Sequence, residues 1–103
     1  MTPEGKVKKK ITDLLTKLEK EGSKIYHEVR VAVGPSYKKG LPDLWLVING
    51  KHIEIEVKRE EGGVLSTMQI KYQKYFNDLG IPCYVVSNLN EFKEILKKET
   101  PIN

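Results

Sequence analysis

The sequence contains a single cysteine, Cys83, and no long run of apolar residues. One cysteine cannot form a disulfide bond within the chain, and it cannot supply the several thiolates of a zinc or iron–sulfur centre. Because Cys83 lies in the apolar segment 83–86, we expect its thiol to be buried and inert. A segment long enough to span a bilayer and a signal-peptide pattern are both missing, so we expect no membrane association and a cytoplasmic location.

Charged residues, in contrast, are abundant. They make up 31% of the 103 residues and apolar residues make up 39%, which is typical of a folded domain and excludes a disordered chain. This length fits one domain with one modest hydrophobic core. The formal net charge of +4 allows a polyanionic partner without requiring one.

Apolar residues recur at helical spacing in several parts of the chain. The first helix should start at Thr2-Pro3, where a capping side chain precedes a proline, and end at Gly22. A second helix should begin at Ser66, which has the glutamine of a capping box in the following turn, and end at Gly80. Asn90 is the expected cap of a last helix.

Alternating or dense apolar segments predict strands over residues 25–33, 44–48, 51–58 and 83–86. The Asn49-Gly50 pair is a strong signal for a hairpin turn between the second and third of these strands. A strand, a helix and a further strand form a right-handed crossover, so the last strand should run parallel to 51–58. The sequence therefore predicts a small α/β domain with a mixed sheet flanked by helices, in the order α-β-β-β-α-β-α.

The hairpin turn also predicts a register. Counting outward from Asn49-Gly50 pairs Trp45 with Glu54 and places Asp43 opposite Glu56. Directly opposed side chains share one face of the sheet, with β-carbons about 4.5–5.5 Å apart. Lys58 projects from the same face, while the apolar residues at 53, 55 and 57 project from the other.

Opposed carboxylates need a compensating group. Two of them about 5 Å apart repel by about 3 kcal/mol at an effective dielectric constant near 20. A shared proton, the Lys58 ammonium group or a bound divalent cation would offset the repulsion between Asp43 and Glu56. Carboxylate oxygens are suited to Mg²⁺, Mn²⁺ or Ca²⁺. The alternative is a solvated sheet edge on which Glu54, Glu56 and Lys58 are ordinary surface charges.

Other polar residues near this face have simpler explanations. Glu4 lies in the first turn of the first helix, where the helix dipole stabilises an acid, although this does not explain its place on the buried face. We expect Glu54 to be a peripheral charge and His52 to be a surface histidine. His27 is a metal ligand only in principle.

The ordered motifs resemble the PD-(D/E)xK nuclease superfamily, with Pro42-Asp43 followed by Glu56-Val57-Lys58. Nearly the whole chain is similar to the stand-alone VRR-NUC domains of bacteriophages. The further matching features are an acid at the start of the first helix, the segment GLPD, a glycine-containing loop, the segment LSTMQ and the terminal segment YVVSN, which correspond to Glu4, Gly40–Asp43, Gly62-Gly63, Leu65–Gln69 and Tyr84–Asn88. The resemblance implies a single nuclease domain over residues 1–103 with a restriction-endonuclease-like core.

The resemblance also implies a Mg²⁺- or Mn²⁺-dependent DNA endonuclease. Asp43, Glu56 and the backbone carbonyl of Val57 would bind the metal, and Glu4 would complete the site as an outer ligand or through water. Lys58 would orient or activate the attacking water and stabilise the developing charge. Gln69 would help to position that lysine or the phosphate, although a capping-box role explains the same glutamine. These two roles of Gln69 are not exclusive.

Basic residues near the motifs are candidates for DNA contacts. Lys38, Lys39 and Arg59 flank the site in the sequence, and Lys8 and Lys9 lie on the first helix. Tyr37 would stack on a base or sugar, or be an ordinary loop tyrosine. The sequence contains no base-reading motif, so we expect contacts with the DNA backbone and its shape.

The substrate and assembly expectations come from the resemblance as well. Similarity to archaeal Holliday junction resolvases implies a homodimer that cuts branched, four-way DNA, in the cytoplasm of a bacterial host if the chain is phage-encoded. We expect no small-molecule cofactor. The alternatives are a less selective nicking, flap or single-strand nuclease, and a non-catalytic DNA-binding module that keeps the fold. Apolar residues of the second helix belong either to the core or to an interface, and they are Met68, Tyr72, Tyr75 and Phe76.

Overall fold

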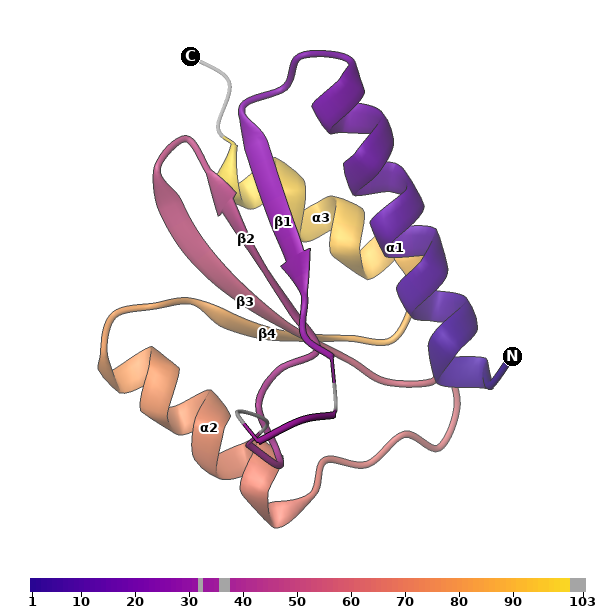
Figure 1. Ribbon diagram of the computed structural model, residues 1–103, viewed down its shortest axis with the longest axis vertical. Helices are drawn as coiled ribbons and strands as arrows, with labels where there is room; N and C mark the ends of the chain where they lie inside the picture. Colours follow the sequence, from indigo (N-terminus) through magenta and orange to yellow (C-terminus); the bar gives the residue numbers. More distant parts are fainter. Residues whose placement is uncertain (32, 36–37, 101–103) are drawn as a thin grey trace.

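The computed structural model describes residues 1–31, 33–35 and 38–100, so Tyr37 lies outside the described residues. The elements of the described part are α1 (Pro3–Lys20), β1 (Ile25–Val29), β2 (Leu44–Ile48), β3 (Lys51–Val57), α2 (Thr67–Asp78), β4 (Cys83–Val86) and α3 (Leu89–Glu99). This confirms the predicted α/β class and the order α-β-β-β-α-β-α (Figure 1).

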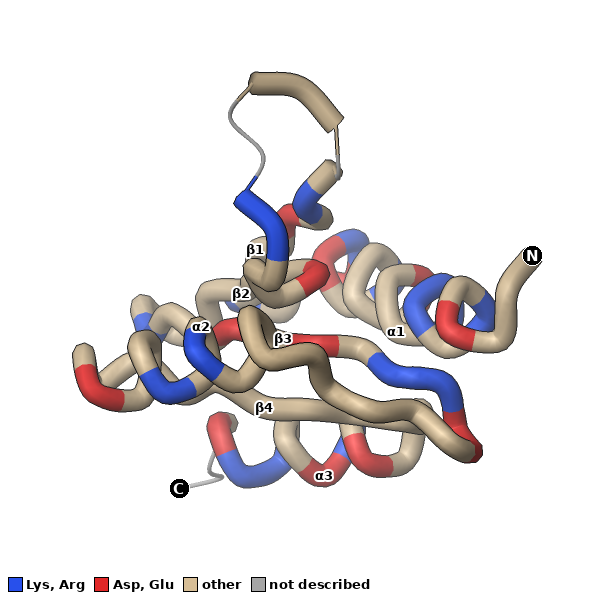
Figure 2. The backbone as a smooth tube through the Cα atoms, turned by 90° about the horizontal axis from the view of Figure 1, so that it is seen from below, with Lys and Arg blue, Asp and Glu red and all other residues tan. Residues whose placement is uncertain are grey.

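The strands form one mixed sheet in the order β1-β2-β3-β4. The neighbours β1/β2 and β2/β3 are antiparallel, whereas β3/β4 is parallel, as the crossover through α2 predicts. Helices α1 and α2 lie on opposite sides of the sheet, which is clearest in the view along it (Figure 2). Helix α3 packs with α1 on the same face.

The hydrophobic core lies between the sheet and the pair α1 and α3. Every second residue of β2 and β3 points into it because side chains alternate along a strand, and apolar residues of α1 meet them at helical spacing. The fully buried members are Ile11, Leu15, Leu44, Leu46, Ile48, Ile53, Ile55, Val57, Val86 and Phe92. Cys83 is buried too, on the opposite face of the sheet, as predicted.

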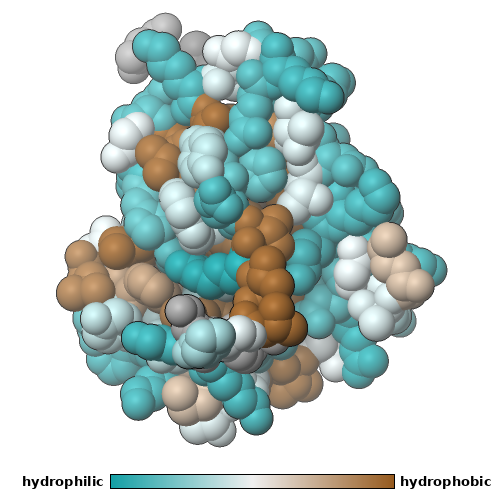
Figure 3. Space-filling view, in the orientation of Figure 1, coloured by the Kyte–Doolittle hydropathy of each residue, from teal (hydrophilic) through white to brown (hydrophobic). Residues whose placement is uncertain are grey.

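Strand β1 is shorter than the predicted strand 25–33. Its last residue, Val29, pairs with Leu44, the first residue of β2. Beyond it the backbone N–H of Arg30 donates to the Asp43 carbonyl at 2.8 Å, and the strand ends there. Val31 and Val33 are therefore 69% and 73% exposed despite their strand-like alternation. Figure 3 shows apolar surface over the end of β1 and the segment that follows.

Helix α3 begins earlier than predicted. Its N-cap is Asn88 rather than Asn90, and the Asn88 side chain accepts a hydrogen bond from the Glu91 N–H at 2.8 Å. The Glu91 carboxylate in turn accepts from the Ser87 N–H at 2.6 Å. Asn90 has a lysine, Lys93, at the equivalent position, which cannot accept a hydrogen bond. The Glu91 carboxylate therefore favours Asn88 over Asn90 as the N-cap of α3.

Helix α2 has no buried residue among those described. Its aromatic side chains Tyr72, Tyr75 and Phe76 pack mainly on one another, with ring centroids 5.7–6.4 Å apart. Ile70 and Leu79 are each more than half exposed. The aromatic group thus lies outside the core. None of the described helices is both long and apolar enough to cross a bilayer.

Gly40 lies in the segment that precedes β2 and packs closely against Met68 of α2. Its φ angle is +93°, and a β-carbon at this position would lie 2.5 Å from the Met68 β-carbon and 2.8 Å from the Met68 carbonyl carbon. Only glycine permits both this conformation and this close approach. The contact fixes the start of α2 beside Asp43, which follows Gly40 closely in the chain.

We expect Gly40→Ala to destabilise the fold by more than about 2 kcal/mol, because it combines backbone strain with overpacking. Gly80→Ala is the matched control, since Gly80 has a φ angle of +80° but no atom near its missing β-carbon. That control should show only the backbone cost of about 1–2 kcal/mol. Equal losses in urea unfolding would contradict the contact with Met68.

Candidate metal centre

The predicted hairpin register is present in the structure. Trp45 pairs with Glu54 and Leu44 with Ile55, so the next step places Asp43 opposite Glu56. Glu4 joins them from the start of α1, which the Thr2 side chain caps by accepting from the Gly5 N–H at 3.0 Å. Carboxylate oxygens of Glu4, Asp43 and Glu56 all lie within 4.8 Å of one another. Figure 2 shows acidic and basic positions on α1, and acidic positions along β3 followed by basic ones after it.

The proline of the Pro42-Asp43 pair shapes the site by ending the ladder. Glu54 and Lys58 donate their backbone N–H groups to β4, so the Val57 N–H between them faces β2. Continuing the register places Pro42 opposite Val57. The Val57 N–H instead donates to the Asp43 carboxylate, Oδ2, at 2.8 Å. Pro42 has no N–H to offer the Val57 carbonyl, which suits the predicted role of that carbonyl as a ligand.

Glu56 is the most buried acid of the cluster, with 4% of its surface exposed. One oxygen, Oε1, accepts a hydrogen bond from Gln69 Nε2 at 2.8 Å, while Oε2 is buried without a partner among the described residues. Burial and the neighbouring Asp43 charge raise the pKa of Glu56 to about 8, against the lowering effect of Lys58. An unpaired buried oxygen beside two further carboxylates is suited to a cation.

Lys58 and Gln69 meet at the cluster as predicted. Lys58 Nζ donates to Gln69 Oε1 at 2.8 Å and lies 3.8 Å from Glu56 Oε1 and 3.9 Å from Glu4 Oε1. The same Gln69 oxygen accepts from the Ser66 N–H at 2.8 Å, which completes the capping box of α2. Gln69 therefore makes the capping-box contact and also binds the Lys58 ammonium group. The capping box orients an amide that contacts two residues of the cluster.

The basic residues predicted near the site differ in position. Lys8 Nζ lies 3.5 Å from Asp43 Oδ1, whereas Lys9 pairs with Asp13 on the outer side of α1. Arg59 donates to the Gly62 carbonyl at 3.1 Å and lines a cavity of about 540 Å³ together with Glu4 and Lys58. Lys38 and Lys39 are exposed on the segment that precedes Asp43.

The expectation of a peripheral Glu54 is wrong. This residue is fully buried, and its carboxylate pairs with both terminal nitrogens of Arg30, the Nη2–Oε2 distance being 3.0 Å. His52, expected to be a surface histidine, has a side chain that is 41% exposed and places Nε2 2.6 Å from Glu54 Oε2. The alternative of a solvated edge therefore fails for Glu54 and Glu56.

Arg30 was not among the predicted site residues, although the β1–β2 register carries a signal for it. Glu28 pairs with Trp45, so Arg30 falls beside Asp43 on the same face. Counting that register from the sequence was not possible, because β1 and β2 are joined by a long segment rather than by a tight turn.

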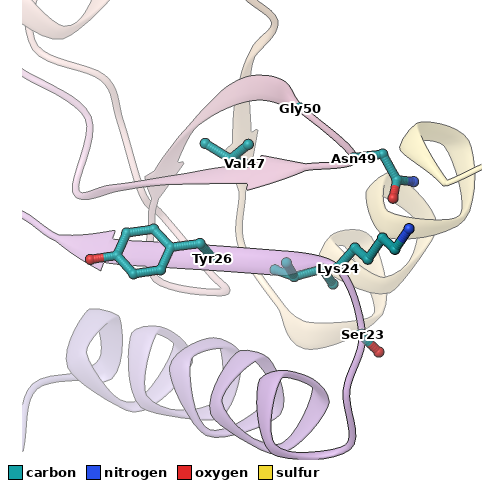
Figure 4. Close-up of a pocket in the computed structure, with 7 residues that line it drawn as sticks. Ser23, Lys24, Tyr26, Val47, Asn49 and Gly50 are labelled. Atoms are coloured by element: carbon teal, nitrogen blue, oxygen red, sulfur yellow. The ribbon is translucent and has the colours of Figure 1, made fainter.

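A second hollow, of about 550 Å³, lies at the turn end of the sheet (Figure 4). Its lining includes Lys24, Tyr26, Asn49 and Gly50 but no carboxylate. It is open and shares no residue with the acidic cluster. The acidic residues that could bind a metal therefore lie at the opposite end of the hairpin from this hollow.

Comparison with protein-family models, curated proteins and solved structures finds no match to this chain. The atoms that could bind a metal indicate which ion suits the cluster. They are carboxylate oxygens with a backbone carbonyl nearby, a set that suits Mg²⁺ or Mn²⁺ and lacks the thiolate and imidazole ligands typical of structural zinc. The cluster is therefore a candidate site for a hard divalent cation.

The raised pKa of Glu56 predicts how the stability of the metal-free protein depends on pH. Between the ordinary value of 4.5 and about 8, folded Glu56 retains a proton that the unfolded chain has lost. Through this residue, the free energy of unfolding should fall as the pH rises from about 5 to about 8. Saturating Mg²⁺, which binds the ionised group, should reduce the loss.

Urea unfolding in a chelator at several pH values measures this effect, with Glu56→Gln as the reference. The reference retains every other titrating group near the site, including Glu4, Asp43 and Lys58. The difference between wild type and Glu56→Gln should therefore isolate the contribution of Glu56. The same pH dependence in both proteins would contradict a protonated Glu56.

Proposed function

We propose that this chain is a Mg²⁺- or Mn²⁺-dependent DNA endonuclease of the VRR-NUC type, with a restriction-endonuclease-like core. The observation that carries the proposal is the meeting of Glu4, Asp43 and Glu56 around a buried, unpaired carboxylate oxygen, with the Lys58 ammonium group beside them. Three acids and one lysine from three separate segments of the chain meet at this cluster. This arrangement suits metal-assisted hydrolysis of a phosphodiester.

Asp43, Glu56 and the Val57 carbonyl would hold the cation, with Glu4 as an outer or water-mediated ligand. The cation would supply charge neutralisation for the phosphate and acidify a bound water. Asp43 keeps its orientation through the Val57 N–H, and Glu56 keeps its own through the Gln69 amide. Each carboxylate thus retains an oxygen that is not used in that hydrogen bond.

Lys58 is the residue best placed to act on the reacting atoms. Its side chain is only 13% exposed, and Gln69 fixes its ammonium group at 2.8 Å. A restrained ammonium group next to the metal ligands can orient the attacking water and stabilise negative charge that develops on the phosphate. An exposed lysine would instead sample many positions, so the restraint by Gln69 supports this role.

The surroundings of the cluster support a polyanionic substrate. Arg59 lines the cavity of about 540 Å³ that also contains Glu4 and Lys58, and Lys8 lies next to Asp43. Exposed Lys38 and Lys39 extend the positive charge along the chain toward the site. These groups suit contacts with successive phosphates of a DNA strand.

We further propose that the substrate is a four-way junction and that the enzyme acts as a homodimer. Tyr75 and Leu79 lie one turn apart at the end of α2 and are each more than half exposed, so they are the apolar side chains that a contact with a second copy would cover. The acids and the lysine are all retained, which argues against a non-catalytic DNA-binding module. A less selective nuclease with the same chemistry is the remaining alternative, and the choice of substrates tests it.

Cleavage of labelled four-way junctions, flaps and linear duplexes with Mg²⁺ or Mn²⁺ tests the proposal. Asp43→Ala and Lys58→Ala should each reduce the rate by at least about 10²-fold, because each removes a group that acts on the reacting centre. Lys97→Ala and Glu94→Ala are the matched controls, since these residues pair with each other on the exposed side of α3. Both controls should cut at the wild-type rate.

Two outcomes separate the parts of the proposal. A folded wild-type protein that cuts no DNA with either metal would contradict the nuclease assignment. Equal rates on junction, flap and duplex would retain the nuclease and exclude the junction selectivity.

A further inference from the structure

Glu54 is a fully buried carboxylate that no step of the proposed hydrolysis uses. It receives two hydrogen bonds from the Arg30 guanidinium group and a contact from His52 Nε2 at 2.6 Å. A buried ion pair adds little net stability, because desolvation offsets most of the attraction between the charges. The contacts that Arg30 makes besides Glu54 are therefore informative.

Arg30 contacts the two peptide groups that flank the Asp43 α-carbon. Its Nη1 donates to the Pro42 carbonyl at 3.0 Å, and its backbone N–H donates to the Asp43 carbonyl at 2.8 Å. This is the point at which Pro42 interrupts the ladder between β2 and β3. Arg30 thus holds the Pro42–Asp43 segment in place where the strand hydrogen bonds are missing.

We propose that Arg30 and Glu54 are positioning residues that fix the Asp43 carboxylate for metal binding. Glu54 orients the guanidinium group, Arg30 fixes both carbonyls of the Pro42–Asp43 pair, and Asp43 then directs Oδ2 to the Val57 N–H. The inference rests on the proposed function, because it assigns these residues to the same metal centre. Neither side chain is assigned a contact with metal or substrate.

The guanidinium group is needed for this role. Its planar set of N–H donors binds the Glu54 carboxylate in two places and still reaches the Pro42 carbonyl. A lysine would keep the positive charge but has one nitrogen and no fixed plane. Arg30→Lys therefore retains charge compensation for Glu54 while it removes the geometric link. Partners that orient metal ligands typically affect affinity or activity by about 10–100-fold when they are removed.

The experiment measures Mn²⁺ affinity by electron paramagnetic resonance and backbone amide exchange by NMR, in Arg30→Lys, Glu54→Gln and the double variant. We expect Mn²⁺ affinity to fall by about 10–100-fold in each single variant. We also expect the Val57 amide to exchange faster relative to the Ile53 and Ile55 amides of the same strand. Because the two residues act in series, the double variant should be no weaker than the weaker single variant.

Glu99→Gln is the matched control. Glu99 is the other acid paired in a largely buried position at a distance from the site, with Lys51 at 2.7 Å and the Tyr84 hydroxyl at 2.5 Å. This variant should lower the melting temperature without changing Mn²⁺ affinity or the exchange of the Val57 amide. A loss of Mn²⁺ affinity as large as that in Glu54→Gln would overturn the proposal, because a general loss of stability would then explain both.

The two readouts separate this inference from the proposed function. If the wild type binds Mn²⁺ and folded Arg30→Lys binds it equally well, the positioning role is overturned and the metal centre stands. If the wild type binds no Mn²⁺, the proposed function fails, and the Val57 amide still tests the positioning of Asp43. Unchanged relative exchange of that amide in both single variants would overturn the positioning role by itself. Glu54→Gln, which keeps the shape of the side chain, provides the test if Arg30→Lys does not fold.

Discussion

The repulsion between Asp43 and Glu56 is the constraint on which the site depends. The register of the hairpin places the two acids opposite each other, and the carboxylate of Glu4 comes within 4.8 Å of both. Glu4 adds to this repulsion, whereas the other close contacts of the pair reduce it. The ammonium groups of Lys8 and Lys58 lie next to the two carboxylates. The Val57 N–H donates a hydrogen bond to Asp43, and the Gln69 amide donates one to Glu56. The compensation is incomplete, because the pKa of Glu56 is still raised to about 8.

The hydrophobic core is what forces the acids together. Ile53, Ile55 and Val57 are completely buried on the face of β3 that packs against α1 and α3. A slip of one residue would move these side chains to the other face of the sheet, so the core selects one register. The same register buries Glu54 and Glu56 on the opposite face. Burial on one side of the strand thus maintains an unfavourable set of charges on the other side.

Local rules explain why much of this could be predicted from the sequence. The Asn49-Gly50 turn fixes the β2–β3 register, and the capping box fixes Gln69, because each depends on residues close in the chain. The end of β1 and the burial of Glu54 depend instead on where a distant segment lies. Nothing local says that Arg30 will reach Glu54 across β2. The N-cap of α3 differs from the predicted one for a local reason. Both Asn88 and Asn90 fit the capping pattern, and only the Glu91 carboxylate distinguishes them.

The charges around the cluster connect metal binding to substrate binding under the proposed function. Lys8 Nζ lies 3.5 Å from Asp43 Oδ1, where its ammonium group compensates part of the acidic charge. A divalent cation at Asp43 would take over that compensation, and the ammonium group would then be available to a phosphate. A proton on Glu56 acts in the same way, because it neutralises the site until a cation displaces it. The metal would therefore both complete the acidic cluster and release positive charge toward DNA, so the two ligands should favour each other's binding.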